Sequence, residues 1–90
     1  MNEKLIERKL SELVRTKGGI AIKLYSAYFT GLPDRLILMP GGRTYFVELK
    51  TTGKKPTARQ KVVHGMLRDL GFAVEVIDSQ EGIEKFIQTL

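Results

Sequence analysis

The stretch "GLPDRLILMPGGRTYFVELKTTGKK", residues 31–55, decides the fold. Two runs rich in β-forming residues, "RLILMP" and "TYFVELK", lie on either side of a Pro-Gly-Gly turn and predict a β-hairpin. Three charged residues interrupt this pattern: Asp34 precedes the first run, and Glu48 and Lys50 lie in the second. An unpaired buried carboxylate costs several kcal/mol, so acids in these strands require a cation or a hydrogen-bond donor nearby.

The rest of the chain predicts helices and strands around this hairpin. Apolar residues recur at helical spacing in residues 3–17, with Asn2 as N-cap, and again after Thr57 and after Asp78 or Ser79. The runs "IAIKLYS" and "FAVEVI" indicate two further strands. The order is αβββαβα, and its final strand-helix-strand unit predicts a parallel pair, hence an α/β fold with a mixed sheet flanked by helices. The apolar side of the second helix is predicted to comprise Ala58, Val62, Val63, Met66, Leu67 and Leu70.

Composition limits the classes of protein to consider. The chain of 90 residues fits one domain, has no cysteine for disulfides or thiolate metal sites, and has no apolar run long enough to span a bilayer. We expect a cytoplasmic protein with no membrane association. The formal net charge of +5 favours a polyanionic partner, with a basic surface that serves solubility as the alternative.

The acids of the hairpin are arranged as a metal site would require. Glu48 and Lys50 are two apart in a strand and share a face, while Asp34 follows a proline at the opening of the partner strand. Two carboxylates beside a lysine suit hydrated Mg²⁺, and the Leu49 carbonyl is a candidate third ligand. The alternative is a salt bridge on a solvated face of the sheet.

The turn decides whether Asp34 reaches this face. A two-residue loop at Gly41-Gly42 would set Asp34 opposite Leu49, on the face away from Glu48. We therefore predict a three-residue loop or a glycine bulge around residues 40–43, which sets Asp34 opposite Glu48 or Lys50.

The motifs "GLPDRLIL" and "FVELKTTGKKPTARQ" resemble the VRR-NUC branch of the PD-(D/E)XK nuclease superfamily, whose single-domain members are found in phages. The αβββαβ core of that fold covers almost the whole chain, so residues 1–90 are expected to form one nuclease domain. The resemblance implies a DNA endonuclease that uses Mg²⁺, with Mn²⁺ as a substitute, and no small-molecule cofactor. For a phage-encoded protein the expected location is the cytoplasm of the host cell.

The resemblance also implies roles for single residues. Asp34 and Glu48 would be metal ligands together with the Leu49 carbonyl, and Lys50 would hold the attacking water or the phosphate. Related Holliday junction resolvases carry an acid on the first helix in an "ER" dipeptide. That dipeptide supplies Glu7 here, acting on the metal through water, with Glu3 as the alternative if the helix docks differently.

The second helix adds a polar residue to the implied site. Gln60 would hydrogen-bond the scissile phosphate or its water, near backbone N–H groups that favour an anion. His64, one turn later, is interpreted as a surface histidine without a catalytic role. The basic residues expected to position DNA are Lys23, Lys54, Lys55 and Arg59.

The resemblance favours Holliday junction resolution as the activity. A homodimer is then expected, because a four-way junction presents two symmetry-related strands to be cut. The first helix and the stretch "YSAYFTGL", Tyr25 to Leu32, are the candidate interfaces. Two alternatives stay open. One is cleavage of nicked, flap or plain duplex DNA, and the other is a non-catalytic basic module that binds nucleic acid.

Overall fold

The elements follow one another in the predicted order in the computed structural model, which describes residues 2–90. The first strand is shorter than the run "IAIKLYS", because its partner strand begins only at Arg35, which pairs with Lys23. The elements are α1 (Glu3–Thr16), β1 (Ile20–Lys23), β2 (Arg35–Met39), the 3₁₀ turn η1 (Pro40–Gly42), β3 (Arg43–Leu49), α2 (Ala58–Asp69), β4 (Ala73–Ile77) and α3 (Gln80–Gln88).

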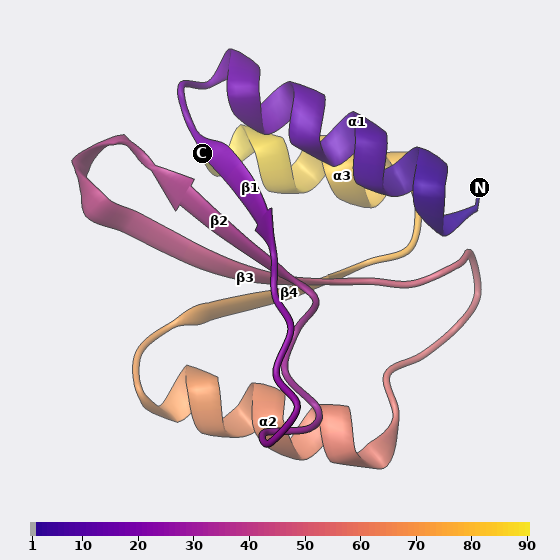
Figure 1. Cartoon of the computed structure of the whole chain (residues 1–90). Coiled ribbons are helices and arrows are strands. Elements are labelled where there is room, and N and C mark those ends of the chain that lie inside the picture. Colours follow the sequence, from indigo (N-terminus) through magenta and orange to yellow (C-terminus); the bar gives the residue numbers. More distant parts are fainter. Residues whose placement is uncertain (1) are drawn as a thin grey trace.

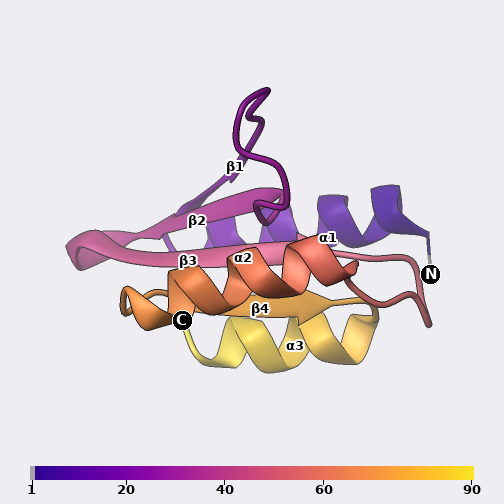
Figure 2. The same cartoon turned by 90° about the horizontal axis from the view of Figure 1, so that it is seen from below.

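The strands form one mixed sheet in the order β1-β2-β3-β4. The β2–β3 pair is antiparallel and β3–β4 is parallel, as the sequence pattern predicted. The β1–β2 pair is also antiparallel. Helices α1 and α3 cover one face and α2 the other (Figure 1). Seen from below, α2 lies over β3 and β4, whereas β1 and the loop after it extend beyond the helix (Figure 2). The α2 face of the sheet is therefore only partly covered.

The helices begin at capping residues that the sequence indicates. Asn2 accepts a hydrogen bond from the Leu5 N–H at 2.9 Å, and Ser79, rather than Asp78, caps α3. At α2, Thr57 and Gln60 form a reciprocal capping box, which fixes the first turn of the helix. In the described part of the chain, no helix is long and apolar enough to cross a membrane.

The main core lies between the sheet and the α1–α3 layer. Alternate residues of β2 point into it, so Ile37 and Met39 are buried there, and Arg35 lies on the same side. Residues 34, 36 and 38 consequently face α2. Large side chains of this core come from α1, the sheet and α3: Ile6, Leu10, Ile37, Leu49, Ile83 and Phe86.

The hairpin has the predicted three-residue loop. Residues 40–42 form it, with Gly41 and Gly42 at φ values of 80° and 76°, a region that strongly favours glycine. Met39 consequently pairs with Arg43 and Arg35 pairs with Val47. One further step along this register sets Asp34 opposite Glu48. The expected register is confirmed.

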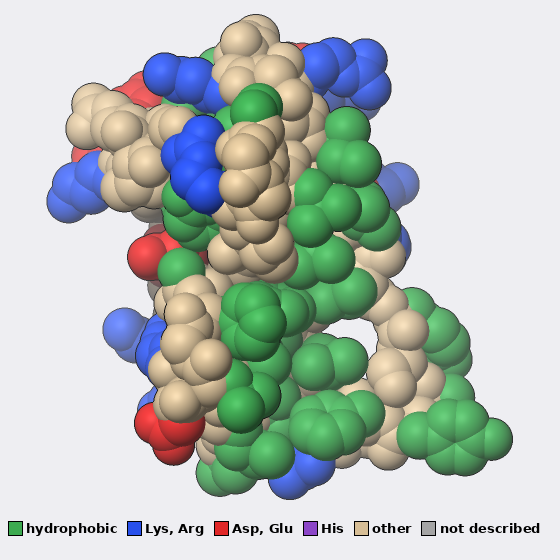
Figure 3. All heavy atoms as spheres, turned by 90° about the vertical axis from the view of Figure 1, so that its left-hand side faces the viewer, with side chains coloured by type: hydrophobic (Ala, Val, Ile, Leu, Met, Phe, Trp, Pro, Cys, Tyr) green, Lys and Arg blue, Asp and Glu red, His purple; other side chains and the backbone are tan. Residues whose placement is uncertain are grey.

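The apolar side predicted for α2 is buried only in part. Val63 is buried and Leu67 half-buried, and His64, which was not predicted there, is also buried. Because α2 covers only part of its face of the sheet, the other predicted residues are exposed: Ala58, Val62, Met66 and Leu70. Figure 3 shows hydrophobic side chains gathered across this end of the molecule. We refer to the exposed hydrophobic residues here as the α2-side surface: Ile20, Ile22, Val62, Met66, Leu70 and Phe72.

Gly19, between α1 and β1, is required by close packing. A Cβ added there would lie 2.3 Å from Met39 Sδ and 2.6 Å from the Leu38 carbonyl oxygen. We predict that Gly19→Ala lowers the free energy of unfolding by about 1–3 kcal/mol, because backbone has to move. Gly65→Ala is the control, since it is inside α2 with no neighbour within 4 Å, and should raise that free energy by about 0.5–1 kcal/mol. Urea unfolding would measure both, and equal stability of Gly19→Ala and the wild type would contradict the packing.

Candidate active site

Asp34 is held at the start of β2 by the strands on either side. Its carbonyl oxygen accepts a hydrogen bond from the Leu24 N–H at 2.8 Å. Its two carboxylate oxygens each lie 3.3 Å from the Leu49 N–H of β3. The carboxylate of Asp34 is thus fixed beside the end of β3, next to Glu48.

Glu48 is a buried acid, with only 3% of its surface exposed. Its Oε2 lies 3.4 Å from Lys50 Nζ and accepts a hydrogen bond from Gln60 Nε2 at 3.3 Å. Its Oε1 lies 3.7 Å from His64 Nε2. Side chains from β3 and α2 therefore surround the carboxylate on both of its oxygens.

Burial changes the titration of both acids. Burial and, after it, the negative charge of Asp34 raise the pKa of Glu48 to about 7, while Lys50 opposes the change. Burial also raises the pKa of Asp34, against the lowering effects of Arg35 and the Leu49 N–H. The protein thus places two close carboxylates where full ionisation of both is disfavoured unless positive charge is added.

The donor set fits a hard divalent cation. Glu48 Oε1 is buried and accepts no hydrogen bond within residues 2–90. The same residues contain no group of three or more His, Cys, Asp or Glu side chains suited to a metal. Mg²⁺ needs no such group, because it binds one or two carboxylates and keeps several waters. Asp34, Glu48 and the Leu49 carbonyl suffice for that type of binding.

The acid of α1 reaches the site through an arginine. Glu7 Oε2 lies 2.7 Å from Arg35, whose guanidinium also lies 3.4 Å from Asp34 Oδ1. Glu3 and Lys23 line a shallow hollow together with these three residues. Glu7 is thus linked to Asp34 through Arg35, whereas the negative charge of Glu3 acts directly on Asp34 and raises its pKa. Lys23 lies at the rim of the site.

Gln60 is held at both ends of its amide. Its Oε1 accepts a hydrogen bond from the Thr57 N–H at 2.9 Å, and its Nε2 points to Glu48. The amide thus joins the first turn of α2 to the buried acid, in addition to any contact with a phosphate.

His64 and Arg35 are the neighbours of the acids that sequence reasoning missed. His64 is not a surface residue: it is 2% exposed, and burial lowers its pKa, as do the charges of Arg68 and Lys50. Its spacing of four from Gln60 was an available signal, because such residues share a helix face. Arg35 directly follows the aspartate of the motif, but its burial could not be read from the spacing.

The other predicted basic residues follow β3 in the chain and are exposed. Lys54 and Lys55 are exposed in the loop between β3 and α2. That loop is tied to β4 by the Gly53 N–H, which lies 3.3 Å from Asp78 Oδ2. Arg59 is exposed but engaged, because its guanidinium lies 5.8 Å from the centre of the Phe29 ring.

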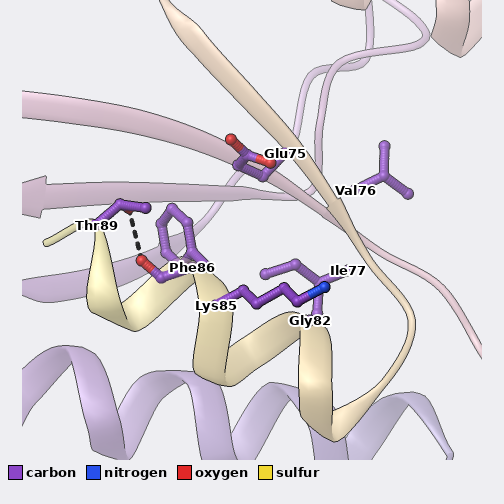
Figure 4. A pocket seen from close by; sticks show the side chains of 7 residues that line it. All are labelled: Glu75, Val76, Ile77, Gly82, Lys85, Phe86 and Thr89. Atoms are coloured by element: carbon purple, nitrogen blue, oxygen red, sulfur yellow. Dashed lines mark hydrogen bonds between the residues drawn. The ribbon is translucent and has the colours of Figure 1, made fainter.

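A separate hollow lies between β4 and α3, on the other face of the sheet. Glu75, Lys85 and Phe86 are among the residues that line it (Figure 4). Glu75 pairs with Val47 in the sheet and therefore faces away from Glu48. This hollow does not belong to the site formed by Asp34 and Glu48.

Comparison with known proteins places the chain in a family. No protein-family model matches the chain. The chain is 46% identical over 81 residues to "Putative nuclease p44" of Acyrthosiphon pisum secondary endosymbiont phage 1, covering 90% of this chain and 87% of that protein. A solved structure described as "VRR_NUC domain" superposes with a TM-score of 0.90 at 31% identity, covering 96% of this chain and 94% of that one. Both comparisons span nearly the whole fold, including the strands that carry Asp34 and Glu48, and the chain therefore belongs to the VRR-NUC family of nucleases.

Proposed function

We propose that this VRR-NUC protein is a Mg²⁺-dependent DNA endonuclease, with Mn²⁺ as a substitute, and that residues 1–90 act as one nuclease domain. The observation that carries the proposal is the pairing of Asp34 and Glu48 across β2 and β3, with Lys50 beside them. A purely structural ion pair needs only one acid for each cation. A second acid on the same face opposes folding, because like charges repel each other.

The residues of the site would have different roles in phosphodiester hydrolysis. Asp34, Glu48 and the Leu49 carbonyl would hold the cation. The cation, when bound, supplies an activated water and stabilises the charge that develops on the phosphate. Lys50 provides a fixed positive charge for the attacking water or the phosphate. Glu7 would act on a water of the metal rather than as a direct ligand.

Contacts outside the metal site would bind and orient the DNA. Gln60 lies where it can donate to the scissile phosphate or its water if its bond to Glu48 opens. Lys23, Lys54, Lys55 and Arg59 offer positive charge to the neighbouring phosphates. The formal charge of +5 supports a polyanionic substrate.

We further propose that the enzyme acts on branched DNA, with the Holliday junction as the favoured substrate, and that it does so as a homodimer. Two symmetric incisions need two sites, and a two-fold dimer supplies them. The α2-side surface supports this proposal, since contiguous exposed hydrophobic residues are rare on monomers without a partner. It differs from the two interfaces that the sequence suggested, which are the first helix and the stretch Tyr25 to Leu32.

A labelled four-way junction, compared with nicked, flap and plain duplex DNA, tests the substrate. We predict that Asp34→Asn and Glu48→Gln each lower Mg²⁺-dependent cleavage by about 10³-fold or more, because a ligand of the cation is lost. Lys50→Ala should also inactivate. EDTA should abolish cleavage by the wild type.

Asp69→Asn is the matched control for these variants, because it removes an exposed carboxylate at the end of α2, outside the site. Its cleavage rate should equal that of the wild type. Near-normal cleavage by any of the three site variants would show that the assignment is wrong. DNA binding without cleavage by the wild type would favour the alternative of a non-catalytic module.

The raised pKa of Glu48 predicts a pH-dependent cost to folding. Between about 4.5 and about 7, the folded protein holds a proton on Glu48 that the unfolded chain has released. The free energy of unfolding therefore falls as pH rises through this window. Metal-free Glu48→Gln has no such charge, so it should be more stable than the wild type at pH 8, by about 2 kcal/mol, with the gain fading toward pH 5.

Urea unfolding in EDTA at several pH values would measure this difference. A difference between Glu48→Gln and the wild type that stays constant from pH 5 to pH 8 would contradict the raised pKa. Added Mg²⁺ at pH 8 should stabilise the wild type and leave Glu48→Gln unchanged, because a ligand stabilises only the state that binds it.

The dimer proposal makes a prediction about the α2-side surface. Met66→Lys places a charge in this surface and should shift the protein from dimer to monomer, because a buried charge without a partner opposes association. Gln88→Lys is the control, since it adds the same charge at the end of α3, on the other side of the sheet. Light scattering would give the mass of each. A wild type that is monomeric both free and bound to a junction would overturn the proposal.

A further inference from the structure

Arg35 is a buried cation at the point where the helix and the sheet of the site meet. It is 5% exposed and occupies the first position of β2. Its guanidinium lies 2.7 Å from Glu7 Oε2 and 3.4 Å from Asp34 Oδ1, and it donates to the Asp34 carbonyl oxygen at 2.9 Å. One side chain thus contacts the acid of α1 and both the backbone and the carboxylate of Asp34.

The position of Arg35 is costly for the fold. The residues that follow it on the same face of β2, Ile37 and Met39, are apolar core residues. A charged group placed there needs hydrogen-bonded partners of opposite charge, because desolvation is expensive. Its partners are the two acids that the proposed function assigns to the metal, rather than acids elsewhere on the surface.

The geometry also explains how acids from opposite sides of the sheet can act together. Asp34 shares the face of Glu48, whereas Glu7 belongs to α1, which covers the other face. A guanidinium has a rigid fork of donors and can hold two carboxylates at fixed positions. Arg35 spans the end of the sheet between them.

We propose that Arg35 is a positioning residue that holds Glu7 and Asp34 in register, so that α1 and β2 present their acids to the same divalent cation. This inference rests on the proposed function of the site. It gives Arg35 no contact with the DNA or the reacting atoms, and its effect passes through the two acids.

Because Arg35 is positively charged, the direction in which metal affinity changes when Arg35 is removed tests the inference. A positive charge 3.4 Å from a metal ligand repels a cation. If Arg35 only neutralised the acids for folding, its removal would free Asp34 and tighten metal binding. If Arg35 positions the acids, its removal weakens metal binding even though a repulsive charge is lost.

The experiment is titration calorimetry of the DNA-free protein with Mn²⁺. We expect Arg35→Met to weaken binding by about 10-fold or more, the range typical of residues that orient metal ligands. Arg35→Lys keeps the charge but lacks the fork, so it should also weaken binding. The double variant Glu7→Gln/Arg35→Met should bind Mn²⁺ no more weakly than Arg35→Met alone, because both substitutions break the same contact between Glu7 and Arg35.

Arg15→Met is the matched control, because it removes one positive charge from the exposed end of α1. Circular dichroism checks the fold, and Arg35→Lys carries the test if Arg35→Met does not fold. Binding of Mn²⁺ by Arg35→Met and Arg35→Lys at wild-type affinity or tighter would overturn the inference alone. Absence of Mn²⁺ binding by the wild type would instead overturn the proposed function.

A cleavage assay separates positioning from a purely structural role. At a fixed DNA concentration, Arg35→Lys should need more Mg²⁺ for half-maximal rate, whereas its affinity for DNA in EDTA should match the wild type. Loss of DNA affinity with an unchanged Mg²⁺ requirement would show that Arg35 acts on the DNA and would contradict the inference.

Discussion

The site depends on the opposition of two carboxylates across β2 and β3. Side chains directly opposite in an antiparallel pair point to the same face of the sheet. Asp34 and Glu48 therefore meet only when the loop of the hairpin has an odd number of residues. The three-residue turn at Pro40–Gly42 fixes this register from the far end of the strands. A turn of glycines with no contact to the site therefore decides whether the acids can share a cation.

The protein surrounds its acids with groups that hold them and neutralise them only in part. Lys50 and Gln60 contact one oxygen of Glu48, and His64 lies near the other. Burial nevertheless keeps the pKa of Glu48 near neutrality. The fold thus carries an electrostatic strain at this position, which a bound cation would relieve. Catalytic sites commonly trade stability for function in this way.

Local signals explain what the sequence could predict. Hydrophobic periodicity and capping residues yielded the order of the elements, because they depend on neighbours along the chain. The hairpin register followed instead from the requirement that Asp34 and Glu48 share a face. The apolar side of α2 was predicted correctly for Val63 but not for Val62, since the two are equally apolar and only tertiary docking chooses between them. His64 was missed for the same reason. Glu7, the partner of Arg35 at 2.7 Å, comes from α1, and no spacing within the hairpin indicates this contact.

The Gln60 amide has a consequence for the loop before α2. Its oxygen is committed to the Thr57 N–H, so the side chain can turn only its nitrogen toward Glu48. The orientation of Glu48 thus depends on an intact first helical turn. Lengthening or shortening residues 50–57 would move the start of the helix and release the amide. The length of this basic loop is constrained by the acid behind it as well as by the DNA that we propose lies in front of it.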